Sequence, residues 1–131
     1  AEGRTIETIG DIYTSQGDYQ RAIESHKQAI ILFQKGGNKS LESINIGRII
    51  SIYQNYLGDN ENALKFINES LELDKNSGDK ERYARTMNQQ ANIKALQGDY
   101  QKALEICNQT LEIARSTKNK NLEADTLRNM A

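Results

Sequence analysis

A seven-residue segment returns three times along the chain at nearly constant spacing. Residues 17–23 read GDYQRAI, residues 58–64 read GDNENAL, and residues 98–104 read GDYQKAL. The period is therefore 41 residues and then 40 residues. A second break keeps step with the first, at residues 37–39, 78–80 and 118–120. Two breaks in each period predict a repeated unit of two helices, joined by one tight turn and one longer connection.

The residues at each break are of the kinds that end one helix and begin the next. Glycine adopts the left-handed conformation found after helices, and Asp or Asn accepts a hydrogen bond from a first turn. We expect such N-caps at Asp18, Asn38, Asp59, Asp79, Asp99 and Asn119. Proline, which interrupts helices, is absent from the 131 residues. The predicted helices cover residues 3–16, 19–35, 39–57, 60–76, 79–97, 100–116 and 119–131.

The second helix of each unit carries one apolar stripe with helical spacing. Only 37% of the residues are hydrophobic, which favours an elongated stack in which each unit is buried against its neighbours. The predicted interior residues are Ala22, Ile23, His26, Ala29, Ile30 and Phe33, then Ala63, Leu64, Ile67 and Leu71, then Ala103, Leu104, Cys107, Leu111 and Ala114.

The first helix of the second unit is one residue longer than its counterpart in the third unit. Position 58 follows position 38 by 20 residues, whereas position 98 follows position 79 by 19. Counted from the helix start, the inward face is Ile46, Ile49, Ile50 and Tyr53, but counted from its end the small core residue is Ser51. Both registers are open, so we expect a local bulge or a longer turn around residues 56–57.

The landmarks of the first unit resemble the signature of the tetratricopeptide-repeat family. They are Ile6, Ile9, Gly10, Tyr13, Gly17, Tyr19, Ala22 and Ala29, and Ala91 and Ala131 keep step with the small residue Gly10. The resemblance implies an all-α fold, a right-handed superhelical α-solenoid of antiparallel helix pairs. We expect one domain over residues 1–131, with units near residues 3–38, 39–78 and 79–118 and a lone final helix over 119–131.

Two departures from the common family pattern stand out. The period is 40–41 residues rather than the usual 34, and the proline that commonly closes each unit is missing. Both features resemble the long repeats of bacterial multi-repeat signalling proteins. The repeats of kinesin light chain and of spindle-orientation adaptors are similarly long, and the residues do not choose among these groups.

The resemblance also implies where a partner would bind, because in this family the first helix of each pair lines a concave surface. We therefore expect a scaffold that binds a partner protein or peptide there. The alternative is a regulatory sensor that binds a peptide or small ligand to control an attached effector. The candidate partner-binding residues are the polar residues predicted to face solvent on the first helices, Arg4, Glu7, Asp11, Thr14, Asn45, Arg48, Asn55, Arg85, Asn88, Asn92, Asp125 and Arg128.

Residues suited to catalysis or to metal binding are sparse. His26 is the only histidine and Cys107 the only cysteine, and both fall on interior stripes, so we expect them to pack rather than react. We predict no enzyme activity, no cofactor and no metal. Glu7 and Asp11 stand where chaperone-binding relatives hold a peptide carboxylate, and they would repel one.

The charge balance and the two ends of the sequence complete the expectations. A formal net charge of −1 disfavours nucleic acid and an anionic membrane surface as partners. The single cysteine favours a reducing compartment, so we expect a cytoplasmic protein. The sequence begins and ends inside helical pattern, so we expect a fragment of a longer chain. The uncovered apolar residues predict end-to-end stacking of molecules, through Ile6 and Ile9 at one end and Leu122, Leu127 and Met130 at the other.

Overall fold

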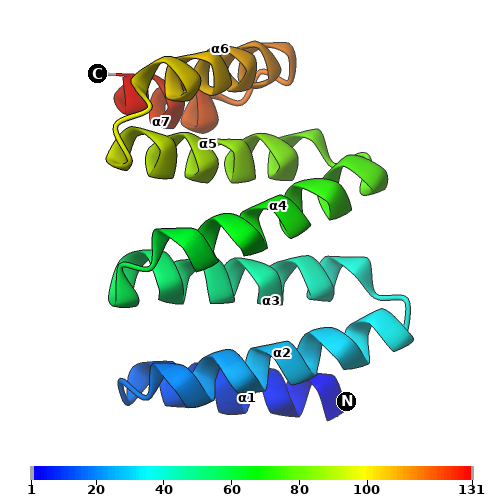
Figure 1. Cartoon of the computed structure of the whole chain (residues 1–131). Helices are drawn as coiled ribbons and strands as arrows, with labels where there is room; N and C mark the ends of the chain where they lie inside the picture. The colour runs from blue at the N-terminus through cyan, green and yellow to red at the C-terminus, as the bar shows by residue number, and fades with distance from the viewer. Residues whose placement is uncertain (1, 131) are drawn as a thin grey trace. The chain divides into compact units, whose positions relative to one another are not determined.

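A computed structural model describes residues 2–130, and over this range the chain is helical, with no strand (Figure 1). The all-α prediction is confirmed. Within the described residues, and with the π-helical residues 52–57 counted as the end of the third helix, the helix ends lie no more than one residue from their predicted positions. The elements are α1 (Glu2–Ser15), α2 (Tyr19–Lys35), α3 (Lys39–Ser51), the π-helical segment η1 (Ile52–Leu57), α4 (Asn60–Ser77), α5 (Lys80–Leu96), α6 (Tyr100–Ser116) and α7 (Lys120–Met130).

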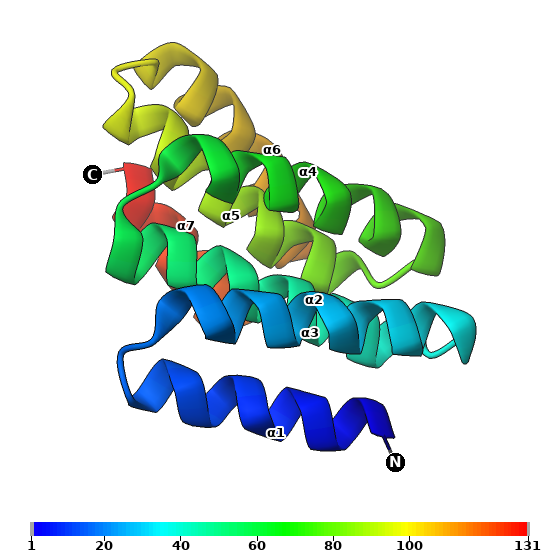
Figure 2. The same ribbon diagram turned by 60° about the horizontal axis from the view of Figure 1, so that its bottom comes forward.

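The chain forms two compact units, Ala1–Leu73 and Asp74–Ala131, and the boundary between them falls inside α4. In the first unit, α2 packs against both α1 and α3, and short turns reverse the chain between them (Figure 2). The ring of Phe66 in α4 contacts η1 and α2. It stacks on Tyr53 of η1 with 5.9 Å between ring centroids, and the Lys27 ammonium of α2 lies 5.6 Å from its centre.

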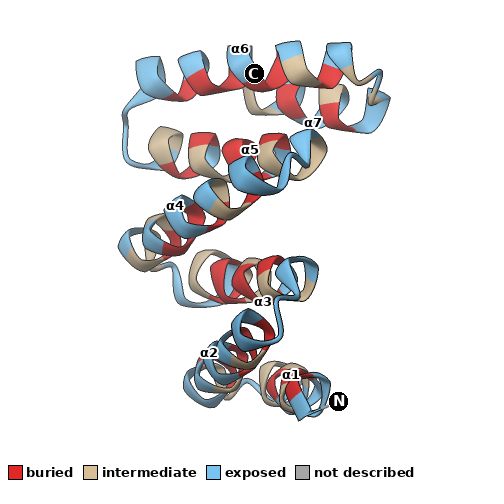
Figure 3. Ribbon diagram, turned by 90° about the vertical axis from the view of Figure 1, so that its right-hand side faces the viewer, coloured by how far each residue is buried: buried red, intermediate tan, exposed pale blue. Residues whose placement is uncertain are grey.

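In the second unit, α6 packs against α5 and α7, and α5 also contacts α7. Figure 3 shows the buried residues of α6 on the side that faces these two helices. Ala84, Ala114 and Leu122 form a small apolar core, with Ile113 packed against it. The expectation that Leu122 is left uncovered is therefore wrong. Leu127, by contrast, is 46% exposed.

All six predicted N-caps are confirmed. Each cap side chain accepts a hydrogen bond from the backbone N–H three residues later, as with Asp18 and Arg21. Asp59 also accepts a bond from the side chain of Asn62, and these two bonds from Asn62 lower the pKa of the Asp59 carboxyl. Local sequence therefore defines where each helix begins.

The residue before each capping residue adopts the left-handed conformation. Five of these positions are glycines with φ between 61° and 85°, namely Gly17, Gly37, Gly58, Gly78 and Gly98. The sixth is Lys118, whose φ is 56°. A side chain with a Cβ is disfavoured in this conformation, so the turn before α7 is strained where its counterparts are not.

The predicted irregularity near residues 56–57 is present as the π-helical segment η1. The Gly58 N–H reaches back five residues to Tyr53 O, and the extra residue is absorbed in this wider turn. The register counted from the helix start holds up to that point. Ile46, Ile49 and Ile50 are buried, whereas Tyr53 and Ser51 are only partly buried.

The second helices bury most of the predicted stripe residues, with one clear exception. All six stripe residues of α2 are buried, whereas Leu64 and Leu71 of α4 are partly buried. Leu104 of α6 is 45% exposed, so its predicted interior position is wrong. Ile106 and Thr110 occupy the interior of α6 instead, because the buried face is rotated relative to the predicted stripe.

The small residue Gly10 allows close packing between α1 and α2. A Cβ built at Gly10 would lie 2.8 Å from the ring of His26, so any larger residue would push the imidazole away. Ala91, in step with Gly10, is also buried. The third residue of this series, Ala131, lies outside the described residues.

Candidate functional site

The first unit carries a groove between its two first helices, which we call the α1–α3 groove. Its volume is about 430 Å³, within the range typical of ligand sites. One end is polar, where Asp11, His26 and Arg48 meet. The lining residues are Asp11, Thr14, His26, Ile44, Gly47, Arg48, Ser51, Ile52 and Tyr56.

A buried amide organises the polar end of this groove. Asn45, which is fully buried, donates from Nδ2 to Glu7 Oε2 at 2.8 Å and to Leu41 O at 2.9 Å. Its Oδ1 lies 3.0 Å from Nδ1 of His26. Both acceptors of the amide nitrogen lack hydrogens of their own, so the orientation of the Asn45 amide is fixed.

The orientation of Asn45 in turn fixes the tautomer of His26. Because Asn45 Oδ1 only accepts, the neutral ring carries its hydrogen on Nδ1 and donates from there. Nε2 then has a lone pair and no hydrogen. It lies 3.6 Å from Asp11 Oδ1, which is also an acceptor. Among the described residues, His26 Nε2 is a buried atom without a hydrogen-bond partner.

Arg48 bridges the two carboxylates of α1. Its guanidinium lies 2.6 Å from Glu7 Oε2 through Nη1 and 3.1 Å from Asp11 Oδ1 through Nε. Glu7 is 8% exposed, so its charge is paired and hydrogen-bonded inside the protein. One cation shared by two anions leaves a formal charge of −1 around the groove.

Burial lowers the pKa of His26 below its ordinary value of 6.5. The hydrogen bond to Asn45 and the carboxylates of Asp11 and Glu7 raise it, and Arg48 lowers it further, but loss of hydration is the largest effect. The imidazole is therefore neutral at neutral pH, and its Nε2 lone pair is then available.

The second unit carries a more polar groove, which we call the α5–α7 groove. Its volume is about 490 Å³. Five candidate residues from the sequence meet there, contributed by the first helices of successive repeats. The lining residues are Arg85, Asn88, Gln89, Asn92, Leu122, Asp125, Arg128 and Asn129.

A buried polar pair lies beneath the α5–α7 groove. Asn88 Nδ2 donates to Thr126 Oγ1 at 3.0 Å, and the Thr126 hydroxyl lies 3.2 Å from Asn88 Oδ1 and 2.8 Å from Leu122 O. At the rim, Arg128 pairs with Asp125 on the same helix. Arg85 and Asn92 are exposed above them.

Three candidate residues are not solvent-facing as expected. Glu7 and Asn88 are each 8% exposed, and Asn45 is fully buried. Each is hydrogen-bonded to the neighbouring first helix, which compensates for its burial. Because these residues are polar, they were expected to face solvent, but their positions lie where two first helices are in contact. Arg4 and Asn55 are exposed but line neither groove.

Sequence reasoning missed a repeated polar position in the first helices. Asn45, Thr86 and Thr126 are spaced by 41 and 40 residues, all are buried, and each donates to the carbonyl four residues earlier. The sequence did carry a signal for this position, because the three residues have the same spacing as the glycine turns. It also missed Gln89 and Asn129, which line the α5–α7 groove.

His26 has more than the packing role expected for it, because it also carries the unpaired Nε2 of the α1–α3 groove. Cys107 is buried as expected, and burial raises the pKa of its thiol, which disfavours the reactive thiolate. Within residues 2–130, no three His, Cys, Asp or Glu side chains are grouped to hold a metal ion. No helix in that range has the length and apolar character needed to cross a membrane.

Comparison with known families gives a match over nearly the whole chain. The sequence model of the family described as tetratricopeptide repeat matches residues 2–76, 40–116 and 82–131, in three overlapping alignments. The alignments begin 38 and then 42 residues apart, which is close to the 40–41-residue period of the glycine turns. A search among curated proteins found no match.

Proposed function

We propose, because this chain belongs to the tetratricopeptide-repeat family, that it is a scaffold whose first helices hold a segment of a partner protein. Repeats of this family generally mediate protein–protein interaction and form non-catalytic scaffolds. The proposal also names the surface at which the partner binds. We assign it to the α5–α7 groove, with the α1–α3 groove as a second contact.

The observation that carries this assignment is the convergence of five candidate residues on one hollow. Arg85 and Arg128 are donors suited to carboxylates, and the exposed amide of Asn92 suits a peptide backbone, since it both donates and accepts. Gln89 and Asn129 add two further amides. A groove of mixed donors and acceptors along two parallel helices favours an extended peptide over a compact ligand.

Two further parts of the proposal concern assembly and location. End-to-end stacking of molecules remains part of it, supported by the exposure of Ile9 and Leu127. A cytoplasmic location and a bacterial origin are proposed from the sequence pattern alone.

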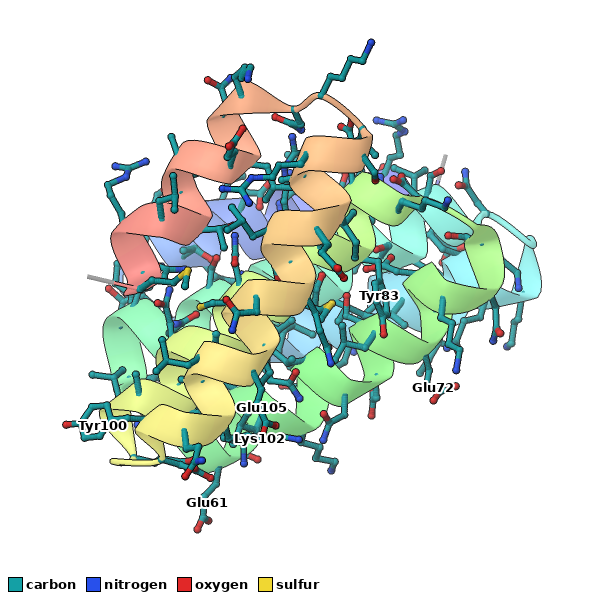
Figure 4. All side chains as sticks on the ribbon, turned by 90° about the horizontal axis from the view of Figure 1, so that it is seen from above. Glu61, Glu72, Tyr83, Tyr100, Lys102 and Glu105 are labelled. Carbon is teal, nitrogen blue, oxygen red and sulfur yellow. The ribbon has the colours of Figure 1, made fainter. Side chains whose placement is uncertain are left out.

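The test uses a double substitution in the α5–α7 groove and a matched double substitution outside it. Arg85→Glu with Asn92→Ala changes two exposed groove residues. Lys102→Glu with Asn108→Ala makes equivalent changes on the exposed face of α6, where Lys102 lies beside Glu105 (Figure 4). Arg48 is left intact because it holds the buried Glu7 carboxylate, so its replacement would disturb folding as well as binding.

Peptides selected from a random displayed library on the wild-type chain serve as probes, and fluorescence anisotropy measures their affinity. The groove variant is expected to bind them at least about tenfold more weakly, as loss of two central contacts predicts. The α6 variant is expected to bind like the wild type. Equal affinity of both variants for every selected peptide would reject the assignment.

A further inference from the structure

The polar end of the α1–α3 groove offers two acceptors and no donor between them. His26 Nε2 presents a lone pair, as fixed by Asn45 on the other side of the ring, and Asp11 Oδ1 lies 3.6 Å away. Neither atom satisfies the other: His26 Nε2 is buried without a hydrogen-bond partner, and Asp11 Oδ1, already paired with Arg48 Nε at 3.1 Å, can accept a further bond. A group that supplies two N–H bonds and no lone pair would satisfy both.

We propose that the α1–α3 groove binds a primary ammonium group on an aliphatic stem, the lysine side chain of a bound peptide, with N–H bonds directed to His26 Nε2 and Asp11 Oδ1. That the lysine belongs to a bound peptide rests on the proposed function. That the site binds a primary ammonium group does not.

The charges around His26 favour a cation. Helix α1 contributes the carboxylates of Glu7 and Asp11, and α3 contributes the guanidinium of Arg48 and the neutral amide of Asn45. Their formal sum is −1, and His26 is neutral at neutral pH because burial lowers its pKa. A bound carboxylate would be repelled by the carboxylates of Glu7 and Asp11. A bound ammonium is attracted by the one negative charge that Arg48 leaves unneutralised.

The remaining wall of the groove suits an alkyl stem. Ile44 is 40% exposed and Tyr56 is 56% exposed, and both line the groove together with Ile52. Lysine buries its methylene groups against apolar surface while its charged end meets polar groups.

The test follows His26 directly in the full chain. Because His26 is the only histidine, its two ring nitrogens give unambiguous signals in long-range ¹H–¹⁵N spectra. The probe is n-butylammonium, titrated near neutral pH at constant ionic strength. We expect a saturable shift of Nε2 with a dissociation constant of about millimolar, as suits so small a ligand, while Nδ1 keeps its hydrogen.

Two matched probes separate charge from hydrogen bonding. Butyltrimethylammonium keeps the charge but has no N–H, and n-butanol keeps a donor but has no charge. Both are expected to bind about tenfold more weakly or worse, since each lacks one part of the recognition. Equal binding of either probe would overturn the assignment to a primary ammonium, and so would the absence of a saturable Nε2 shift.

Asp11→Asn is expected to weaken n-butylammonium binding about tenfold, whereas Glu24→Gln, an equal charge change on the exposed face of α2, is expected to leave it unchanged. Equal effects would contradict the proposal. Lowering the pH provides a measure on the unmodified chain, because protonated Nε2 donates to Asp11 and no longer accepts. Binding that persists after His26 protonates would also overturn it.

The outcomes distinguish this inference from the proposed function. A chain whose α5–α7 groove variant loses peptide binding but whose His26 ignores n-butylammonium rejects the lysine site alone. A chain whose Nε2 responds to the probe while both groove and control variants bind peptides equally rejects the α5–α7 assignment alone.

Discussion

Asn45 donates a 2.8 Å hydrogen bond to Glu7, although the two residues are 38 positions apart and both are buried. The same separation of 38 recurs between Asn88 and Thr126 in the second unit. Each pair joins the first helices of successive repeats, α1 to α3 and α5 to α7. The repeat therefore places a buried hydrogen bond where two first helices meet. This bond requires specific partners, so it fixes the register of the two helices more closely than apolar packing alone would.

Replacement of Asn45 by Leu is expected to destabilise the chain by about 3 kcal/mol. The change leaves the buried Glu7 carboxylate with one donor fewer and His26 Nδ1 with no acceptor, and unsatisfied buried groups cost this much. Urea unfolding followed by circular dichroism measures the loss. The matched change Asn92→Leu, at an exposed position of α5, is expected to stay within about 0.5 kcal/mol. Similar losses from both variants would show that the buried network contributes nothing special.

The helices could be predicted from the sequence because their limits depend on neighbouring residues. Asp18 caps the helix that begins beside it, and Gly17 takes the left-handed turn just before it. Such signals lie within a few positions of the structure that they determine. The predicted interior of α2 was confirmed for the same reason, since one apolar stripe on one helix needs no knowledge of other helices.

The candidate site could be predicted only in part, because its geometry depends on contacts between distant residues. In the sequence, Glu7 and Asn45 have the polar character of solvent-exposed residues. Only the contact between α1 and α3 shows that they are buried and hydrogen-bonded to each other. The unpaired Nε2 of His26 follows from a chain of three hydrogen bonds that no spacing displays. The positions of Arg85 and Asn92 were easier to predict, since both residues are exposed on α5, as their polar character suggests.

The stability of the chain is expected to fall as the pH is lowered through 6.5, because His26 titrates at a lower pH in the folded chain than in the unfolded chain. Its pKa is lowered in the folded state, so the unfolded chain binds more protons in the interval between the two pKa values. The contribution is complete above the unfolded value near 6.5 and decreases as the pH falls toward the folded pKa. Urea midpoints at a series of pH values measure the slope.

His26→Gln is the matched variant for this pH dependence, because glutamine keeps a polar side chain but does not titrate. We expect it to be less stable than the wild type at neutral pH and to show a flatter profile over the same interval. Since His26 is the only histidine, no second imidazole complicates the comparison. An unchanged slope in the variant would assign the pH dependence to carboxylates instead.

Lys118→Gly is expected to stabilise the chain by about 1 kcal/mol. Lys118 adopts φ of 56°, a conformation that costs this amount for a residue with a Cβ and nothing for glycine. The reverse change Gly78→Ala, at an equivalent turn with φ of 77°, is the control and is expected to destabilise by a similar amount. An added Cβ at Gly78 meets no atom within 4 Å, so backbone conformation alone is tested. Thermal unfolding that moves in the same direction for both variants would refute this explanation.

Deletion of Asn55 is expected to convert η1 into ordinary α-helix continuous with α3. The segment holds the one residue by which the 41-residue period exceeds 40, and Asn55 is exposed within it. Because the wide turn already absorbs the extra residue, its removal is expected to change the free energy of unfolding by less than about 1 kcal/mol. The stacked rings of Tyr19 and Tyr56, 4.8 Å apart, report whether the end of the segment stays in place.

Deletion of Gln89 is the control, because α5 has no such turn and every later residue of that helix would rotate by about 100° relative to its neighbours. Ala91 and Ile93, which are buried on different sides of α5, would then lose their present contacts, and we expect a loss of more than about 3 kcal/mol. Urea unfolding compares the two deletions, and carbon chemical shifts follow the helical state of residues 52–57. A loss from the Asn55 deletion as large as that from Gln89 would show that the π-helical geometry is itself required for packing of the first unit.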